Sequence, residues 1–177
     1  GNFRHSANRI VSETITGNSP TVCLSCPEGK WSNIMGLNIT KGCISCKPGY
    51  YSDIVGAINL YTCNKCDNGK YRAKNMLMCL DCPVGSISNE IMNQCQLCIP
   101  GKYSTNGIFC TKCDDGYVSI NNGSSFCSEC SIGKIASNIN DKCISCKSGF
   151  YEVNRYICEK CQIDKYSPND DSPNCAS

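Results

Sequence analysis

The chain has 177 residues, a formal net charge of +2 and 19 cysteines, about one residue in nine. Leu, Ile, Val and Phe together account for only 34 residues, 19% of the chain, which is too few for a conventional apolar core. The near-balance of 17 basic and 15 acidic residues leaves no strong field for nucleic acid or anionic lipid, so neither is expected as a partner. Cysteine above about 8 to 10% instead predicts a disulfide scaffold.

Residues 1–22 contain no cysteine and form a non-repeat arm or linker. They include a strand-like run, Ile10–Ile15, and a turn signal at Gly17–Pro20. They lack the charged start and apolar stretch of a secretory leader, and no run in the chain approaches the roughly 18 apolar residues of a membrane helix. We therefore expect a mature chain or part of a longer one, with no membrane span within these residues.

A tandem CxxC array occupies residues 23–175. Its doublets start 15 to 20 residues apart, and Cys175 begins a tenth in register, so we expect the array to continue beyond residue 177. We number the repeats 1 to 9 by these doublets: Cys23/Cys26, Cys43/Cys46, Cys63/Cys66, Cys79/Cys82, Cys95/Cys98, Cys110/Cys113, Cys127/Cys130, Cys143/Cys146 and Cys158/Cys161.

Each repeat reads as a turn, a short strand, a polar loop and a short return strand. The third residue after the second Cys is Gly in eight of nine repeats and Asp164 in the ninth, which favours a turn there. The fifth residue is aromatic or β-branched, as in Tyr51 and Ile135. No window has helical periodicity. The predicted fold is a set of small disulfide-rich repeats, mostly short β-hairpins and loops with no helices, stacked as an elongated, rod-like solenoid of about nine CxxC repeats.

The doublets could bind zinc, act as redox dithiols or form disulfides. Zinc modules would show paired short and long intervals, whereas these are nearly uniform, and the single histidine, His5, lies in the arm. No βαβ context supports a redox motif. Structural disulfides fit best and indicate an extracellular or cell-surface location. Two sequons, at Asn38 and Asn122, lie in polar loops and are predicted to carry N-linked glycans.

No residue pattern indicates catalysis. The chain contains no nucleophile elbow, phosphate loop or metalloprotease helix. Trp31 replaces a tyrosine of other repeats and is interpreted as packing. The pairs Asp114-Asp115 and Asp170-Asp171 lack the spacing of a calcium loop and are interpreted as exposed turns. We therefore expect no enzymatic activity, no bound metal and no cofactor.

The recurrent Cys-x-x-Gly-x-Tyr-Ser, as in CKPGYYS and CIPGKYS, followed by a loop and CxxC, resembles known extracellular modules. These are the ephrin-receptor-like cysteine-rich repeats and the first loop of tumour necrosis factor receptor modules. The pattern is also similar to growth-factor-receptor (furin-like) repeats and to protist cysteine-rich surface proteins. The resemblance covers the array from Cys23 to Cys175 and is specific for the module rather than for a function.

This resemblance implies that the second Cys of each doublet joins the first Cys of the next. The implied pairs are Cys26–Cys43, Cys46–Cys63, Cys66–Cys79, Cys82–Cys95, Cys98–Cys110, Cys113–Cys127, Cys130–Cys143, Cys146–Cys158 and Cys161–Cys175. Cys23 is left unpaired or paired outside the chain. An interlaced alternative joins Cys23 to Cys43 and Cys26 to Cys46 and repeats by blocks of four; it stays open, with the sequential ladder favoured.

Two functions fit these features. The first is an extracellular structural element, a stalk, surface coat or fibre segment, whose partners are proteins or copies of itself. The second is a ligand-binding receptor or adhesion ectodomain of tumour necrosis factor receptor-like type. We favour the first because the repeats are numerous and no loop shows the aromatic or arginine cluster expected of a receptor contact.

Overall fold

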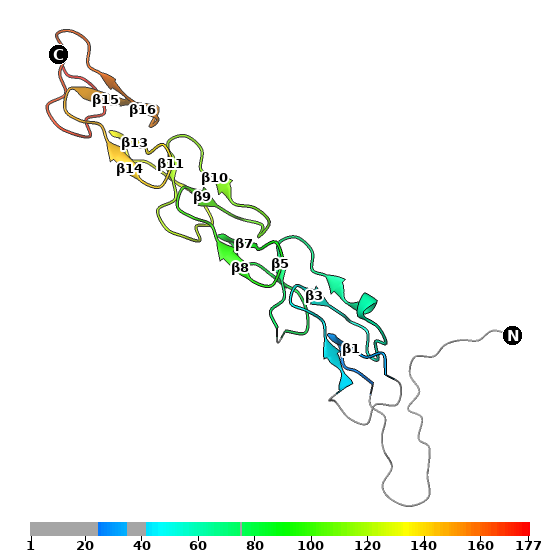
Figure 1. The fold of residues 1–177 in the computed structure, drawn as a ribbon. Coiled ribbons are helices and arrows are strands. Elements are labelled where there is room, and N and C mark those ends of the chain that lie inside the picture. Colours follow the sequence, from blue (N-terminus) through cyan, green and yellow to red (C-terminus); the bar gives the residue numbers. More distant parts are fainter. Residues whose placement is uncertain (1–24, 35–41, 75) are drawn as a thin grey trace, which may run out of the picture. The chain divides into compact units, whose positions relative to one another are not determined.

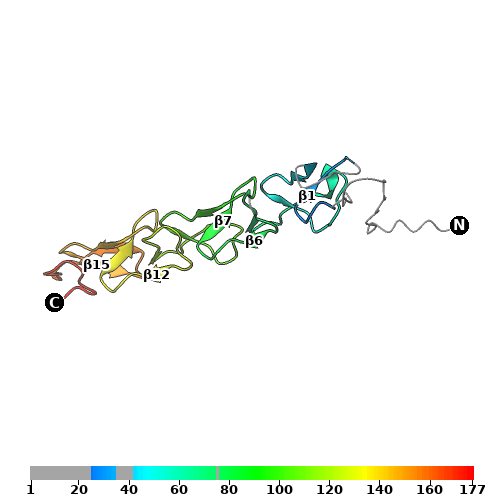
Figure 2. The same ribbon diagram turned by 90° about the horizontal axis from the view of Figure 1, so that it is seen from below.

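The computed structural model describes residues 25–34, 42–74 and 76–177 (Figure 1). The expected arm of residues 1–22, Cys23 and the sequon at Asn38 lie outside them. Contacts divide the chain into two compact bodies. Body 1 comprises Gly1–Asp67, Tyr71–Leu80 and Glu90–Gln94, and body 2 comprises Asn68–Lys70, Asp81–Asn89 and Cys95–Ser177. Figures 1 and 2 show the hairpins of body 2 following one another in chain order from β7 to β15.

Every strand is short and belongs to a two-stranded sheet, in which each odd-numbered strand pairs with the even-numbered strand that follows it. The strands are β1 Lys30–Trp31, β2 Ile44–Ser45, β3 Tyr50–Tyr51, β4 Asn64–Lys65, β5 Lys70–Tyr71, β6 Leu80–Asp81, β7 Ser86–Ser88, β8 Cys95–Leu97, β9 Lys102–Tyr103, β10 Thr111–Lys112, β11 Tyr117–Val118, β12 Ser128–Glu129, β13 Lys134–Ala136, β14 Cys143–Ser145, β15 Phe150–Val153 and β16 Ile157–Lys160. Repeat 9 closes instead through the isolated bridge between Tyr166 and Ala176.

The described part of the chain contains no α-helix, as the sequence predicts. An unexpected element is η2, a single 3₁₀ turn at Leu60–Thr62. The Thr62 hydroxyl donates a hydrogen bond to the Asn59 carbonyl at 2.8 Å, and the Cys63 N–H donates to the Leu60 carbonyl at 3.0 Å. These local bonds tighten the chain immediately before its cysteine doublet.

One backbone hydrogen bond recurs in the first eight repeats. The N–H of the second Cys in the next doublet donates to the carbonyl of the repeat's turn glycine. The bonds run from Cys46 to Gly29, Cys66 to Gly49, Cys82 to Gly69, Cys98 to Gly85, Cys113 to Gly101, Cys130 to Gly116, Cys146 to Gly133 and Cys161 to Gly149, at 2.8 to 3.0 Å. Each hairpin is therefore closed beside a cysteine that also forms a crosslink.

The buried apolar side chains are mainly these second cysteines. Eight of them, from Cys26 to Cys146, are at most 7% exposed, and among the described residues only Ala57, Met92 and Val118 join them as buried apolar side chains. Many isoleucines and leucines remain exposed. Sulfur at the junctions thus replaces the apolar core that the composition cannot supply.

Consecutive repeats are joined through the turn glycine and the sixth residue after the second Cys of the next repeat. In repeats 1, 2, 4, 5 and 8 the glycine N–H donates to the carbonyl of this sixth residue. These bonds run from Gly29 to Ser52, Gly49 to Arg72, Gly85 to Ser104, Gly101 to Ser119 and Gly149 to Ser167, at 2.6 to 2.9 Å. In two other repeats a side-chain oxygen takes this place, Ser88 Oγ for Gly69 and Glu152 Oε2 for Gly133.

The turn glycine also meets a loop two repeats further along. A Cβ on Gly101, which has φ +83°, would overlap the carbonyl oxygen of Ile139. Gly49 faces Ile91 in the same way, and Gly133 faces Asp171. Glycine is required here both for its positive φ and for the space it leaves. Asp164 takes the same turn in repeat 9 with φ 69°, as its position in the pattern predicts.

These contacts predict different effects for two matched substitutions. Gly101→Ala should destabilise repeats 5 to 7 by more than the roughly 1–2 kcal/mol that positive φ alone costs an alanine, because the Ile139 carbonyl must also move. Gly149→Ala is the control, since Gly149 has φ +83° and no atom of the described residues other than itself and its chain neighbours lies within 4 Å of the added Cβ. Amide hydrogen exchange with the disulfides intact measures both, and equal effects would contradict a close approach at Gly101.

Candidate functional site

Nine disulfides connect successive repeats. They join Cys26 to Cys43, Cys46 to Cys63, Cys66 to Cys79, Cys82 to Cys95, Cys98 to Cys110, Cys113 to Cys127, Cys130 to Cys143, Cys146 to Cys158 and Cys161 to Cys175. These are the pairs of the sequential ladder. The interlaced alternative needs Cys26 to pair with Cys46, whereas each of these residues has a different partner.

The crosslinks close loops of 12 to 17 residues. In the chain-entropy model, a loop of about 15 residues stabilises by roughly 3 kcal/mol. The bonded sulfurs are not the thiolates that zinc requires. In the described ranges, no group of three or more His, Cys, Asp or Glu side chains is placed to hold a metal ion. The cysteines therefore serve the scaffold.

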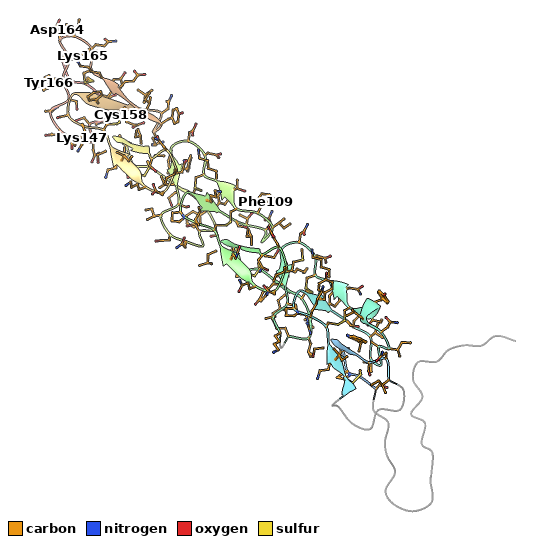
Figure 3. The ribbon with its side chains drawn as sticks, viewed as in Figure 1. Phe109, Lys147, Cys158, Asp164, Lys165 and Tyr166 are labelled. Atoms are coloured by element: carbon orange, nitrogen blue, oxygen red, sulfur yellow. A yellow bond between two sulfur atoms is a disulfide. The ribbon has the colours of Figure 1, made fainter. Side chains whose placement is uncertain are left out.

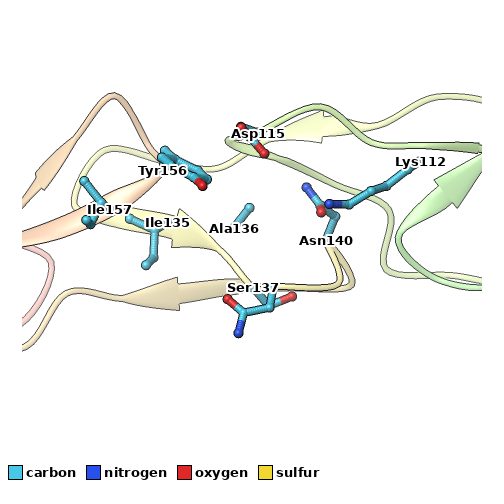
Figure 4. A pocket seen from close by; sticks show the side chains of 9 residues that line it. Lys112, Asp115, Ile135, Ala136, Ser137, Asn140, Tyr156 and Ile157 are labelled. Atoms are coloured by element: carbon cyan, nitrogen blue, oxygen red, sulfur yellow. The ribbon is translucent and has the colours of Figure 1, made fainter.

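A hollow of about 380 Å³ lies in body 2. Figure 4 shows Ile135, Tyr156 and Ile157 towards one end and Lys112 and Asn140 towards the other. The amide of Asn140 is engaged in the fold, because its Nδ2 donates to the carbonyls of Asp114 and Tyr117 at 2.9 Å. The hollow thus has apolar side chains towards one end and polar side chains towards the other.

Exposed apolar side chains precede several doublets. Phe109 is 57% exposed and projects from repeat 5, as Figure 3 shows. Tyr61, Met78, Phe126 and Tyr156 lie at neighbouring positions of their own repeats and are between 59% and 93% exposed. Repeats 4 and 7 carry Asn93-Gln94 and Asp141-Lys142 at the corresponding positions. The apolar residues differ from repeat to repeat, so the shared scaffold does not require them.

The pair Asp170-Asp171 does more than form the exposed turn that the sequence suggests. The Asp170 carboxylate accepts hydrogen bonds from Lys147 Nζ at 3.0 Å and from the Ser148 N–H at 2.9 Å. The Asp171 N–H donates to the Cys146 carbonyl at 2.9 Å, and its carboxylate lies 3.7 Å from Lys134 Nζ. The two aspartates therefore attach the loop of repeat 9 to repeats 7 and 8.

Hydrogen bonds shift the pKa of two exposed groups. The Lys147 ammonium, with the Ser148 N–H, holds the pKa of Asp170 below its ordinary value. The carboxylate of Glu159 accepts a hydrogen bond from the Tyr151 hydroxyl at 3.2 Å and raises the pKa of that phenol. Neither shift lies in a catalytic arrangement. Asp170 links the loop of repeat 9 to Lys147 and Ser148 of repeat 8, a contact that we call the Asp170 latch. The Tyr151 hydrogen bond to Glu159 joins the two strands of the β15–β16 hairpin.

The sixth position after the second Cys is a further feature of the repeats. It is serine in six of nine repeats, and five of these serines are buried: Ser32, Ser52, Ser104, Ser119 and Ser167. Sequence reasoning overlooked this position, although its recurrence was visible. Arg72 replaces the serine in repeat 3 and is only 2% exposed. An arginine at a position that is usually serine was the feature of the sequence that could have identified Arg72 as a residue with a separate role.

No protein-family model matches the chain, and no curated protein is significantly similar to it. The assignment therefore depends on the tandem crosslinked hairpins. The chain is a cysteine-rich repeat protein. Its many disulfides are typical of extracellular or secreted proteins. Within the part of the chain that the structure covers, no helix has the length and apolar character needed to cross a bilayer.

The disulfide ladder predicts a low thiol content. The chain unfolded without reductant should show at most one or two free thiols, because 18 of its 19 cysteines are bonded and an odd count leaves at least one. Ellman titration and mass spectrometry measure this, with the reduced chain as control, and chelators should leave the fold unchanged. Stoichiometric zinc with most thiols reduced would contradict the assignment.

The Asp170 latch predicts a dependence on pH. Because the folded pKa of Asp170 is lowered, its stabilisation is complete above the ordinary pKa of about 3.9 and is lost as pH falls through the folded pKa. Lys147→Gln should raise the pKa of Asp170, measured by NMR titration of its carboxyl carbon. Lys165→Gln, which removes an equal charge from repeat 9, is the control. An unchanged Asp170 pKa in Lys147→Gln would refute the latch.

Proposed function

We propose that the chain is an extracellular structural element, a stalk, surface coat or fibre segment, and not an enzyme. The observation that carries the proposal is that the same covalent and hydrogen-bonded connections recur between successive repeats. Each described repeat has its own disulfide, and most have a glycine N–H bonded to the next repeat. This arrangement supports a function that depends on length and durability, since each added repeat brings its own joint.

The surroundings of the charged groups support a non-enzymatic role. Carboxylates of Asp81, Glu129, Asp170 and Asp171 face lysines or arginines in structural ion pairs. Asn122 lies exposed in the loop of repeat 6, where a glycan can project into solvent. A glycosylated, crosslinked array suits a surface exposed to proteases. Its partners would be copies of itself or other extracellular proteins.

A receptor or adhesion function is the second candidate. It is favoured by the exposed apolar side chains before the doublets, above all Tyr61, Phe109 and Phe126. Such side chains are common at the centres of protein interfaces. In the structural proposal the same side chains contact neighbouring copies. The two functions therefore differ in the partner that covers these residues.

Solution shape and protease resistance test the structural proposal together. A compact globule of this length has a radius of gyration near roughly 16 Å, and we expect small-angle scattering from the oxidised chain to give a clearly larger value. The oxidised chain should also resist trypsin, although many lysines of the described residues are exposed, whereas the reduced and alkylated control should be cleaved rapidly. A globular radius, or equally rapid cleavage of both forms, would overturn the proposal.

A further inference from the structure

Arg72 is a buried cation at a position that holds serine in six of the nine repeats. Its backbone follows the shared pattern, because its carbonyl accepts from Gly49 N–H at 2.9 Å and its N–H donates to the Met92 carbonyl at 2.8 Å. Its side chain, however, replaces a small hydroxyl with a guanidinium that is only 2% exposed. The scaffold does not require arginine, since Ser119 of repeat 6 makes both backbone bonds, accepting from Gly101 N–H at 2.8 Å and donating to the Asn140 carbonyl at 3.0 Å.

The guanidinium is only partly satisfied by the protein. Its Nη1 donates to the Cys46 carbonyl at 3.2 Å and has a longer contact of 3.5 Å with the Lys47 carbonyl. Its Nε is buried and has no hydrogen-bond acceptor among the described residues. Within the ranges the structure describes, no carboxylate lies within 4.0 Å of the guanidinium. Burial of an unpaired charge is unfavourable, and here desolvation lowers the Arg72 pKa.

Arg72 lines a hollow of about 230 Å³ within body 1. Lys30 and Lys74 line the same hollow, and among its described lining residues Glu28 supplies the only carboxylate. Neither lysine forms an ion pair with a described residue. Gly29 leaves space at the wall, because a Cβ there would lie 3.1 Å from Arg72 Nη2. Three cations thus surround a space that one anion only partly balances.

We propose that this hollow binds a tetrahedral oxyanion, the sulfate or phosphate group of an extracellular glycan. The planar guanidinium offers its donors in a fork that matches two oxygens of such a group, and the lysines add mobile charges. The hollow has room for the oxyanion and part of the sugar that carries it. Binding would give the buried Arg72 the counter-charge that the described residues do not supply.

A purely structural role would make Arg72 a donor to the Cys46 and Lys47 carbonyls and nothing more. That role does not involve Lys30 or Lys74, because neither lysine contacts these carbonyls in the hydrogen bonds of the structure. It also gives no reason for Glu28 to affect an added anion. Substitutions of Lys30, Lys74 and Glu28 therefore distinguish anion binding in the hollow from a purely structural role of Arg72.

The test titrates the oxidised chain with inorganic sulfate, inorganic phosphate and a sulfated disaccharide at constant ionic strength. We expect saturable binding by isothermal titration calorimetry, with the disaccharide binding more tightly than inorganic sulfate. In the parent chain we also expect a saturable NMR shift of the Arg72 Nε–H. Lys30→Gln and Lys74→Gln should each weaken binding by about fivefold, the size of one exposed charge contact. Glu28→Gln should strengthen it by a similar factor. Arg72→Ser, which restores the common residue, should abolish it.

Lys102→Gln is the matched control. Lys102 occupies in repeat 5 the position that Lys30 occupies in repeat 1, but that repeat is followed two repeats later by Ala136 rather than by an arginine. Its removal should leave the affinity unchanged. Equal, non-saturable shifts with sulfate and chloride would overturn the proposal, as would identical affinities of Lys30→Gln, Lys74→Gln and Lys102→Gln. Saturable binding in which the disaccharide is no tighter than inorganic sulfate would overturn the assignment to a glycan.

Discussion

The bond between each doublet's second cysteine and the next doublet is the constraint on which the rest of the fold depends. These cysteines are the most consistently buried apolar residues of the described chain, while isoleucines such as Ile34 and Ile132 remain about 60% exposed. Apolar burial therefore contributes little of the stabilisation that an ordinary domain obtains from its core. Crosslinks act mainly on the unfolded chain, whose entropy they reduce, so loops can be polar and irregular without the fold losing its stability.

Backbone hydrogen bonds and close backbone contacts fix the rest of the fold. Because these contacts occur at the turn glycines, glycine is as necessary as cysteine. At Gly101 the chain needs a positive φ, a carbonyl that accepts from Cys113 and space for the Ile139 carbonyl. Any side chain compromises the first and third of these requirements. Because the contacts reach one and two repeats along the chain, repeats within one body are positioned by their near neighbours in sequence. Sequence variation is consequently tolerated in the loops and in outward-facing side chains.

Periodicity in the sequence was sufficient to predict the short hairpins and the turn at the third residue after each doublet, which is glycine or Asp164. It also predicted that the cysteines form structural disulfides. It could not predict which repeats meet in space, because a one-dimensional repeat contains no information on the rotation between successive members. The approach of Gly101 to Ile139 and the latch of Asp170 on Lys147 therefore had no counterpart in the pattern. The burial of Ser52 and Ser104 was also missed, since serine in a polar segment is ordinarily an exposed residue.

In a repeat array, residues required by the fold and residues selected for another function show opposite patterns in the sequence. A residue demanded by the fold recurs at the same position in successive repeats, as the glycines and cysteines do. A residue selected for another purpose departs from the repeat, and the departure is most informative where it is energetically unfavourable. Arg72 meets both conditions, because five serines are buried at its position and its guanidinium is buried with no counter-charge from the described residues. An exposed variable residue such as Phe109 meets only the first condition, so it is weaker evidence for a specific partner.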